Sequence, residues 1–242
     1  MKLTNCLFLL ISFIPFLGLA QQKNTDSFKV DGSFIKPYTN QWKTTRVDKN
    51  GQKTLVYKRW TDYGQIIEMD GVKYFHRVQD LYNAVGKITD TWTNLVEQET
   101  LLPKLSHRIN PNGGFFHLEF TPKAIKGRKS KTPQGGEPTQ IDIALTKPVY
   151  DWSLYGMLLV GLPFKANASY NLPHINLQTG KEEVLKATIK GEETVNANPG
   201  KKVKAWRVET NKGMVFWLTK KAPYVIRLEY KVGEAVLVWE ML

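Results

Sequence analysis

Short runs of β-branched and aromatic residues, separated by turn-forming pairs, dominate the chain from residue 41 onward. Asn50-Gly51 and Asp70-Gly71 are two such pairs, and they supply the positive φ angles that tight hairpins need. Strands that follow one another through tight turns pair antiparallel, so the pattern predicts a mainly β fold and not βαβ units. We expect strands at 41–48, 52–60, 63–69, 72–78, 88–96, 99–109, 114–120, 139–146, 202–210, 213–219, 223–230 and 234–241.

One segment breaks this pattern. Residues 152–160 carry no charge, Asp151 precedes them as a good N-cap, and Gly161 stands where a helix would end. The segment is apolar on all sides, which is typical of a helix buried all round. A buried strand is the alternative, and Gly156 inside the run weakens the helix interpretation. The length of the run favours the helix.

The first 20 residues have the three parts of a secretory signal peptide. Lys2 supplies the positive start, residues 7–19 are apolar, and small residues at 18–20 favour cleavage before Gln21. We therefore expect an exported protein, periplasmic or outer-membrane-associated. Residues 21–40 would be an N-terminal extension and residues 41–242 a single β-rich domain.

The single cysteine and the charge limit the chemistry of the mature chain. Cys6 lies inside the predicted signal peptide, so the chain left after cleavage would have no cysteine. Disulfides, thiolate–zinc sites and thiol nucleophiles are therefore not expected in it. No later apolar run is long enough to span a membrane. The net charge of +12 favours anionic partners such as acidic glycans or membrane surfaces. Export removes the protein from nucleic acid, so no nucleic-acid partner is expected.

Residues 121–140 form a basic segment without apolar periodicity. We interpret it as a long loop between two neighbouring strands, with an interdomain linker as the alternative. Loops of this length are usually functional or disordered. The candidate anion-binding residues in it are Lys123, Lys126, Arg128, Lys129 and Lys131.

Several motifs spread over the chain carry a resemblance to a known family. They are the segment 89–103, Lys147-Pro-Val-Tyr-Asp151, Leu162-Pro-Phe164, Ala205-Trp-Arg-Val-Glu209 and Ala222-Pro-Tyr-Val-Ile-Arg-Leu228. With them the chain resembles a secreted bacterial family of unknown function, itself similar to the outer-membrane lipoprotein carriers. The resemblance implies a single strongly curved antiparallel sheet, a half-barrel, wrapped around one buried helix. It supplies no catalytic residue to carry over.

The carrier resemblance implies a lipid-like or amphipathic ligand held beside the helix. The helical candidates for contacting it are Trp152, Tyr155 and Leu159. The strand candidates are Trp42, Trp60 and Trp92, because their strands are rich in Lys, Thr and Asp and look less like core. Three other tryptophans lie in strands dense with aliphatic residues, and we expect them in the core. These are Trp206, Trp217 and Trp239.

One constellation suggests a metal site. If the turn at 110–114 pairs Ile109 with Phe115, then His107 lies opposite His117, and Glu119 points to the same face as His117. Two imidazoles and a carboxylate are the ligand set of a catalytic zinc. Surface histidines of strands are far commoner than ligands, and a register slip of one residue would separate the pair.

The motifs of common enzyme classes are missing from the sequence, including Gly-x-Ser-x-Gly, HExxH and glycine-rich phosphate loops. The leading hypothesis is therefore a non-catalytic binding or carrier protein for an apolar or amphipathic ligand, without a cofactor. The alternatives are an accessory protein that binds anionic glycans or membranes through the basic segment, and a metal-dependent hydrolase.

Overall fold

The computed structural model describes residues 28–111, 113–130, 137–177, 179–198 and 201–242. The predicted signal peptide, residues 1–20, lies outside the described residues, as does Lys131. Within these ranges, no helix combines the length and the apolar character that crossing a membrane would need.

Fourteen strands form one antiparallel sheet, which confirms the prediction of a mainly β, antiparallel fold. The sheet is not closed: β8 and β9 are the two edges of the described part. Its order is β8-β7-β6-β5-β4-β3-β2-β1-β14-β13-β12-β11-β10-β9. The strands are β1 (Tyr38–Val47), β2 (Lys53–Met69), β3 (Val72–Asn83), β4 (Ile88–Glu97), β5 (Pro103–Asn110), β6 (Gly114–Phe120), β7 (Ala124–Ser130), β8 (Thr139–Ala144), β9 (Ser169–Asn176), β10 (Lys181–Asn198), β11 (Lys201–Thr210), β12 (Met214–Leu218), β13 (Val225–Val232) and β14 (Ala235–Met241).

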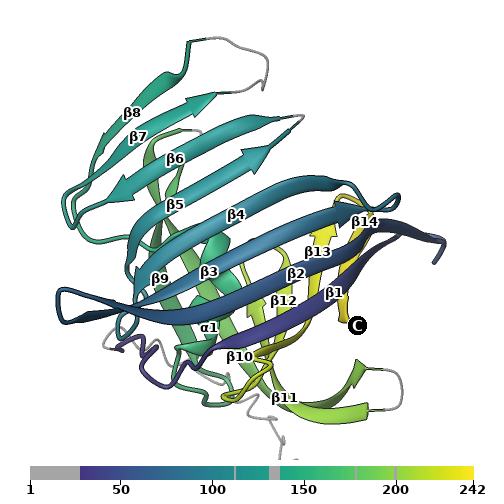
Figure 1. Cartoon of the computed structure of the whole chain (residues 1–242). Helices are drawn as coiled ribbons and strands as arrows, with labels where there is room; N and C mark the ends of the chain where they lie inside the picture. The colour runs from purple at the N-terminus through teal and green to yellow at the C-terminus, as the bar shows by residue number, and fades with distance from the viewer. Residues whose placement is uncertain (1–27, 112, 131–136, 178, 199–200) are drawn as a thin grey trace, which may run out of the picture.

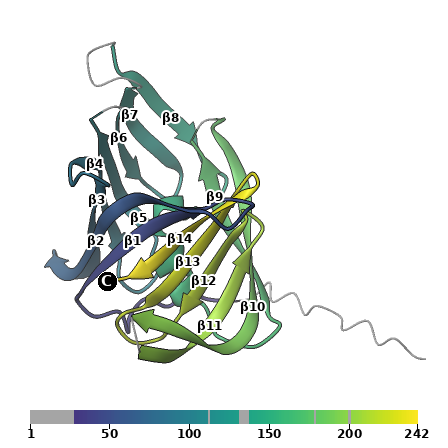
Figure 2. The same cartoon turned by 90° about the vertical axis from the view of Figure 1, so that its right-hand side faces the viewer.

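The sheet consists of two meanders joined by their first and last strands. Strands β1 to β8 follow one another in order, and so do β9 to β14 (Figure 1). The antiparallel pairing of β1 with β14 joins them, with Trp42 opposite Met241 and Thr44 opposite Trp239. Figure 2 shows β2 to β4 of the first meander on the left of the view and β9 to β13 of the second on the right.

The helical segment joins the two meanders. It comprises a 3-10 turn, η1 (Trp152–Leu154), followed by α1 (Tyr155–Val160), so the predicted helix is confirmed. The Asp151 carboxylate accepts a hydrogen bond from the Ser153 backbone N–H at 2.9 Å, which is the predicted N-cap. Gly161 is the C-cap, and a Cβ there would lie 2.7 Å from Val30 Cγ1, so the close approach of the N-terminal segment requires glycine.

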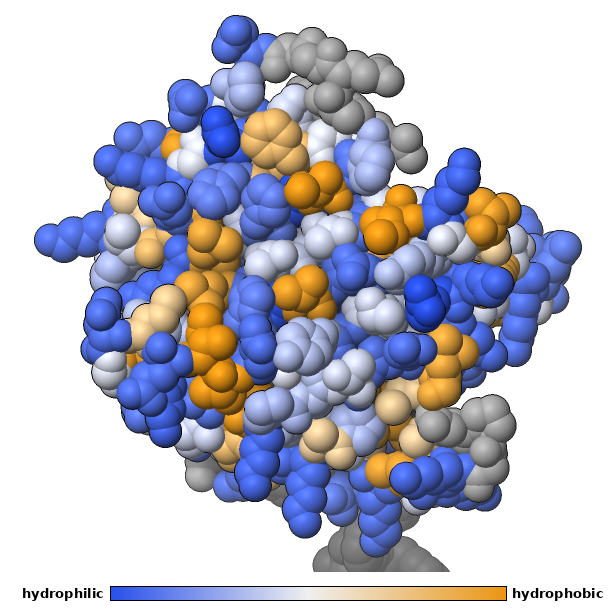
Figure 3. Space-filling view, in the orientation of Figure 1, coloured by the Kyte–Doolittle hydropathy of each residue, from blue (hydrophilic) through white to orange (hydrophobic). Residues whose placement is uncertain are grey.

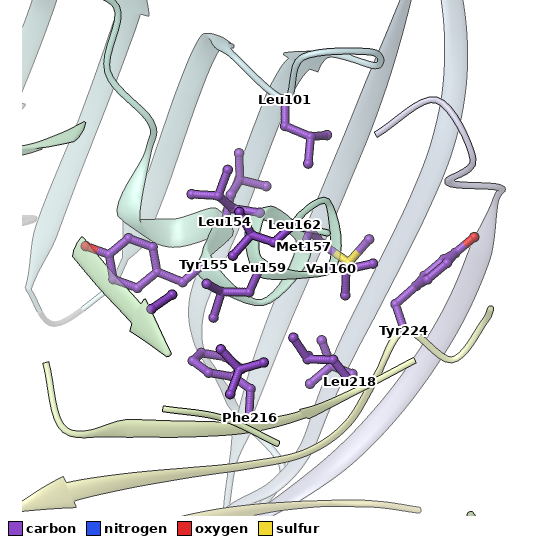
Figure 4. Packing of buried hydrophobic residues seen from close by; sticks show 14 of the residues in the cluster. Leu101, Leu154, Tyr155, Met157, Leu159, Val160, Leu162, Phe216, Leu218 and Tyr224 are labelled. Carbon is purple, nitrogen blue, oxygen red and sulfur yellow. The ribbon is translucent and has the colours of Figure 1, made fainter. Parts of the chain in front are cut away.

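The main core is built around this helix. Met157, Leu158 and Leu159 belong to one buried cluster with residues of both meanders, including Phe75 of β3 and Leu218 of β12. Figure 4 shows Met157 and Leu159 of the helix near Phe216 and Leu218 of β12. The other face of the first meander is mostly hydrophilic, with scattered apolar side chains (Figure 3). The core therefore lies on the face of the sheet that carries the helix.

Three expectations about segments need correction. The predicted strands 52–60 and 63–69 are one continuous strand, β2, because Asp62 has a buried ion-pair partner and does not break the run. The predicted loop 121–140 contains the seven-residue strand β7, so the loop interpretation is wrong there. The predicted extension 21–40 contributes Val30 and Ile35 to the core, and β1 already begins at Tyr38.

Candidate functional site

A cavity of about 220 Å³ opens beside the helical segment, and tryptophans form most of its aromatic lining. We call it the tryptophan pocket. Five of the seven tryptophans of the chain line it, from four strands and from η1. For scale, a dry apolar cavity of about 150 Å³ holds a benzene molecule. Its lining residues are Trp42, Trp60, Arg77, Gln79, Trp92, Trp152, Ser153, Tyr155, Gly156, Met214, Phe216, Val225, Leu228, Tyr230 and Trp239.

The structure brings together five of the six residues that the sequence suggested for ligand contact. They are Trp42, Trp60, Trp92, Trp152 and Tyr155. Leu159 is not among the lining residues, because it is fully buried in the main core at 0% exposure. Trp239, which we expected in the core, is 9% exposed and lines the pocket as well.

Four of the pocket tryptophans pack edge to face in two pairs. The ring centroids of Trp92 and Trp152 are 4.9 Å apart with their planes at 88°. Those of Trp60 and Trp239 are 5.8 Å apart at 71°. Such perpendicular pairs are favoured by the aromatic quadrupole and add to the energy of area burial. Trp152 is the exposed member of the wall, at 39%.

Two buried polar atoms of the lining have no hydrogen-bond partner within the part of the chain that the structure describes. The indole Nε1 groups of Trp42 and Trp239 are buried without a hydrogen-bond acceptor among the described residues. A buried donor without an acceptor costs about 1–3 kcal/mol. The pocket lining therefore includes two indole donors whose hydrogen bonds are unmade within the described chain.

Arg77, one of the lining residues, belongs to a buried ion pair. Arg77 of β3 donates from Nε and Nη2 to the two Asp62 carboxylate oxygens, at 2.8 and 2.6 Å. The Tyr38 hydroxyl approaches the same carboxylate at 3.2 Å. Burial alone would lower the pKa of Arg77, but the Asp62 carboxylate outweighs it and raises the pKa. The guanidinium is thus permanently charged and neutralised by its partner.

The same guanidinium ties the sheet to the helical segment. Arg77 Nη1 donates to the Ser153 carbonyl at 3.2 Å. With its oxygen turned toward these donors, the Gln79 amide accepts from Trp60 Nε1 at 2.9 Å and from Arg77 Nη2 at 3.0 Å. One tryptophan of the wall and the start of the helix are therefore held by one polar network.

A second network surrounds Asp151. Asn94 Nδ2 donates to Asp151 Oδ2 at 3.0 Å and to the Ser106 hydroxyl at 3.1 Å. Burial raises the pKa of Asp151, and hydrogen bonds from Ser106, Ser153 and Asn94 oppose that shift. The network orients η1, and with it Trp152, against β4 and β5.

A larger and more polar cavity of about 710 Å³ adjoins the tryptophan pocket. We call it the polar cavity. Four residues line both cavities, namely Trp152, Tyr155, Met214 and Tyr230. The other lining residues of the polar cavity are Arg108, Asn110, Gly113, Gly114, Phe115, Phe116, Lys129, Ser130, His174, Ile175, Asn176, Leu177, Glu183 and Lys212.

Positive charge predominates in the polar cavity. Arg108, Lys129 and Lys212 line it, and Glu183 is the one carboxylate among the lining residues. Burial, followed by the charge of Lys212, lowers the pKa of His174. The imidazole is therefore neutral at pH 7, and the cavity keeps a net positive charge.

The candidate anion-binding residues do not form one basic loop. Strand alternation places Lys126 and Lys129 on opposite faces of β7. Lys126 is exposed and lies 4.0 Å from Asp142, while Lys129 lines the polar cavity. Arg128 lies over the Phe115 ring at 5.9 Å, and Lys123 lies in the turn before β7.

The predicted register of the histidine pair is confirmed, but the metal site is not formed. His107 lies opposite His117, with ring centroids 5.6 Å apart, and His117 Nε2 is 3.5 Å from Glu119 Oε1. Across the described ranges, no three His, Cys, Asp or Glu side chains are placed to hold a metal ion. Arg128 pairs with His117 from the next strand, and its positive charge disfavours a cation there. The described residues therefore lend no support to the metal interpretation, which stays a prediction.

Sequence reasoning missed the polar residues of the site. Arg77, Gln79 and Asp62 lie on buried positions of strands where apolar residues are usual. Two of them had a weak signal in the sequence: Arg77 and Gln79 stand on either side of the apolar Val78, where a predicted strand ends. His174 and Lys212 gave no signal, because they meet only through the fold.

A comparison with protein families finds one matching family. A family model described as a protein of unknown function, DUF3108, matches residues 72–239, so the chain belongs to this family. A comparison with curated proteins and one with solved structures gave no match.

Proposed function

We propose that this member of the DUF3108 family is an exported, non-catalytic binding or carrier protein that holds the apolar part of an amphipathic molecule in the tryptophan pocket. The observation that carries the proposal is the convergence of five tryptophans on one cavity beside the helix. Ligand sites are typically concave, apolar and lined by aromatic residues, with few polar groups.

The half-barrel arrangement is part of this proposal. It is supported by side chains from both meanders that line the same pocket, such as Trp92 of β4 and Phe216 of β12. A sheet bent around the helix would leave such a space between its two halves. The leader sequence at residues 1–20 supports delivery to the periplasm or the outer membrane.

The unmade hydrogen bonds of the wall also support a bound molecule. A ligand with one acceptor near Trp42 Nε1 or Trp239 Nε1 would satisfy a donor that is otherwise left buried. Buried donors are nearly always paired in proteins. The pocket thus combines apolar area with a small number of polar positions.

The test is native mass spectrometry of the purified protein, with and without added decanol or decanoate. We expect one molecule to bind per chain and to raise the unfolding temperature by mass action. Met214 lines both cavities, so Met214→Trp should fill the space and abolish binding. Met69 is 43% exposed on a hairpin, so Met69→Trp is the matched control. Binding that survives Met214→Trp would place the ligand elsewhere.

A further inference from the structure

We propose that the amphipathic ligand carries an anionic headgroup, a carboxylate or a phosphate, which Lys129 binds in the polar cavity while the chain enters the tryptophan pocket. This inference rests on the proposed function, because it concerns the other end of the same ligand. The shared chemistry is a compact anion attached to one acyl or alkyl chain.

The two cavities share part of their lining, and the proposed ligand would occupy both of them. Trp152, Tyr155, Met214 and Tyr230 line each of them. The lining of the tryptophan pocket is mostly aromatic and aliphatic, and its one charged side chain, Arg77, is already paired with Asp62. The other charged side chains of the site line the polar cavity. A molecule with one apolar and one charged end therefore matches this division along the site.

The cations of the polar cavity differ in how far they are already engaged. Arg108 Nε donates to Asp90 at 2.6 Å, and its guanidinium lies 4.5 Å from the centre of the Trp92 ring. Lys212 is paired with Glu183. Lys129 Nζ reaches only the Leu177 carbonyl, at 3.4 Å, and forms no ion pair with a described carboxylate. Lys129 is thus the cation most available to a bound anion.

His174 is a second, independent pointer to a ligand. Its side chain is 4% exposed, and neither ring nitrogen has a well-aligned hydrogen bond to a described residue, the Ile175 backbone being its one weak partner among them. Nε2 lies 3.5 Å from Glu183 Oε2, close enough for an ion pair but without hydrogen-bond geometry. A neutral imidazole carries one N–H donor. A headgroup oxygen in the cavity would accept from it.

A cationic or neutral headgroup fits this lining less well. A cation would meet three positive side chains and one carboxylate that Lys212 already neutralises. A neutral headgroup would leave the charge of Lys129 without a counterion in a partly enclosed space. A charge-assisted hydrogen bond to an anion is the strongest contact that these groups can make.

The experiment compares four probes with the same ten-carbon chain: decanoate, decyl phosphate, decanol and decyltrimethylammonium. Their affinities are measured at pH 7 by titration calorimetry. We expect decanoate and decyl phosphate to bind about tenfold more tightly than decanol, as one charge-assisted hydrogen bond would give. The two anions separate the possible sources, because a fatty acid presents a carboxylate and a lipid headgroup presents a phosphate.

The variants locate the preference in the cavity. Lys129→Gln should remove the preference for anions and leave the affinity for decanol unchanged, while Lys129→Arg should retain it. Lys126→Gln is the matched control, since it removes the same charge from the opposite face of the same strand. Thermal unfolding of each variant confirms that it is folded.

The outcomes separate this inference from the proposed function. Equal binding of decanol and the anions would overturn the anionic headgroup and leave the pocket as a binding site. Equal losses in Lys129→Gln and Lys126→Gln would also overturn it, because the preference would then come from net charge alone. If none of the four probes binds, the proposed function fails together with the inference.

Discussion

Removal of the Arg77 guanidinium is the perturbation whose size follows most directly from the structure. Arg77 and Asp62 are 6% and 1% exposed in their side chains, and their closest atoms are 2.6 Å apart. Loss of one partner from such a buried pair costs about 3–5 kcal/mol, because the other charge stays buried without compensation. The Ser153 carbonyl also loses its donor. We expect Arg77→Met to lower the free energy of unfolding by about 4 kcal/mol.

Urea unfolding followed by tryptophan fluorescence measures this loss. With an m-value of about 2.5 kcal/mol/M, a loss of this size shifts the midpoint down by about 1.5 M. The m-value itself should not change. Lys126→Met is the control, because Lys126 and Asp142 form an exposed pair at 4.0 Å, and its effect should stay within about 0.5 kcal/mol.

The pH dependence of the loss tests its cause. Without Arg77, the Asp62 carboxylate stays buried without a counter-charge, and burial favours its neutral, protonated form. The folded variant then binds more protons than the unfolded chain, so its stability falls as the pH rises. The deficit relative to wild type should be smaller at pH 4 than at pH 7. A deficit under 1 kcal/mol that does not change with pH would refute the reasoning.

Two further predictions concern single positions outside the site. Lys220 Nζ donates to the Val160 and Leu162 carbonyls, and burial lowers its pKa to about 8. The free energy of unfolding should therefore rise between pH 8 and pH 10.5. Lys220→Met should flatten this rise. A difference between variant and wild type that stays constant over this pH range would contradict the prediction. Gly127 has φ 156°, and a Cβ there would lie 2.0 Å from the His117 carbonyl oxygen. Gly127→Ala should cost about 3 kcal/mol in chemical denaturation and Gly51→Ala, in open space, about 1.

Local signals were sufficient for the helix and for eleven of the strands, but β7, β9 and β10 were not predicted. Asp70 and Gly71 both have positive φ angles, as a tight hairpin requires, and the turn at 110–114 produced the expected register. The uncharged run after Asp151 was long enough to favour a helix. These features depend on neighbours in sequence, which is why the sequence alone indicated them.

The candidate site was only partly predictable, because it depends on contacts between distant residues. The polar texture around Trp42, Trp60 and Trp92 correctly marked their strands as different from ordinary core. The reason was hidden, however: Asp62 and Asp90 are buried and paired with Arg77 and Arg108, whereas other polar neighbours, such as Arg59, are exposed. No local pattern in the sequence shows that such a charge will find its partner.

The basic segment at residues 121–140 is a second case in which the local sequence did not predict the structure. Lysines and glycines without apolar periodicity suggested a loop, yet Ala124–Ser130 pairs with β6 and β8. Only Ile125 of that strand is fully buried, so the strand lacks the alternation of apolar and polar residues that would have predicted it. Pairing on both sides overrides the weak local preference for a strand.

Fluorescence quenching by a brominated acyl chain tests the central claim most directly. Five of the seven tryptophans line one pocket, so bromine bound there would lie next to most of the emitting rings. We predict saturable loss of most of the emission with bromodecanoate, no loss with decanoate, and no saturable loss in Met214→Trp. An emission that stays unchanged at saturating bromodecanoate, while the chain remains folded, would contradict the account.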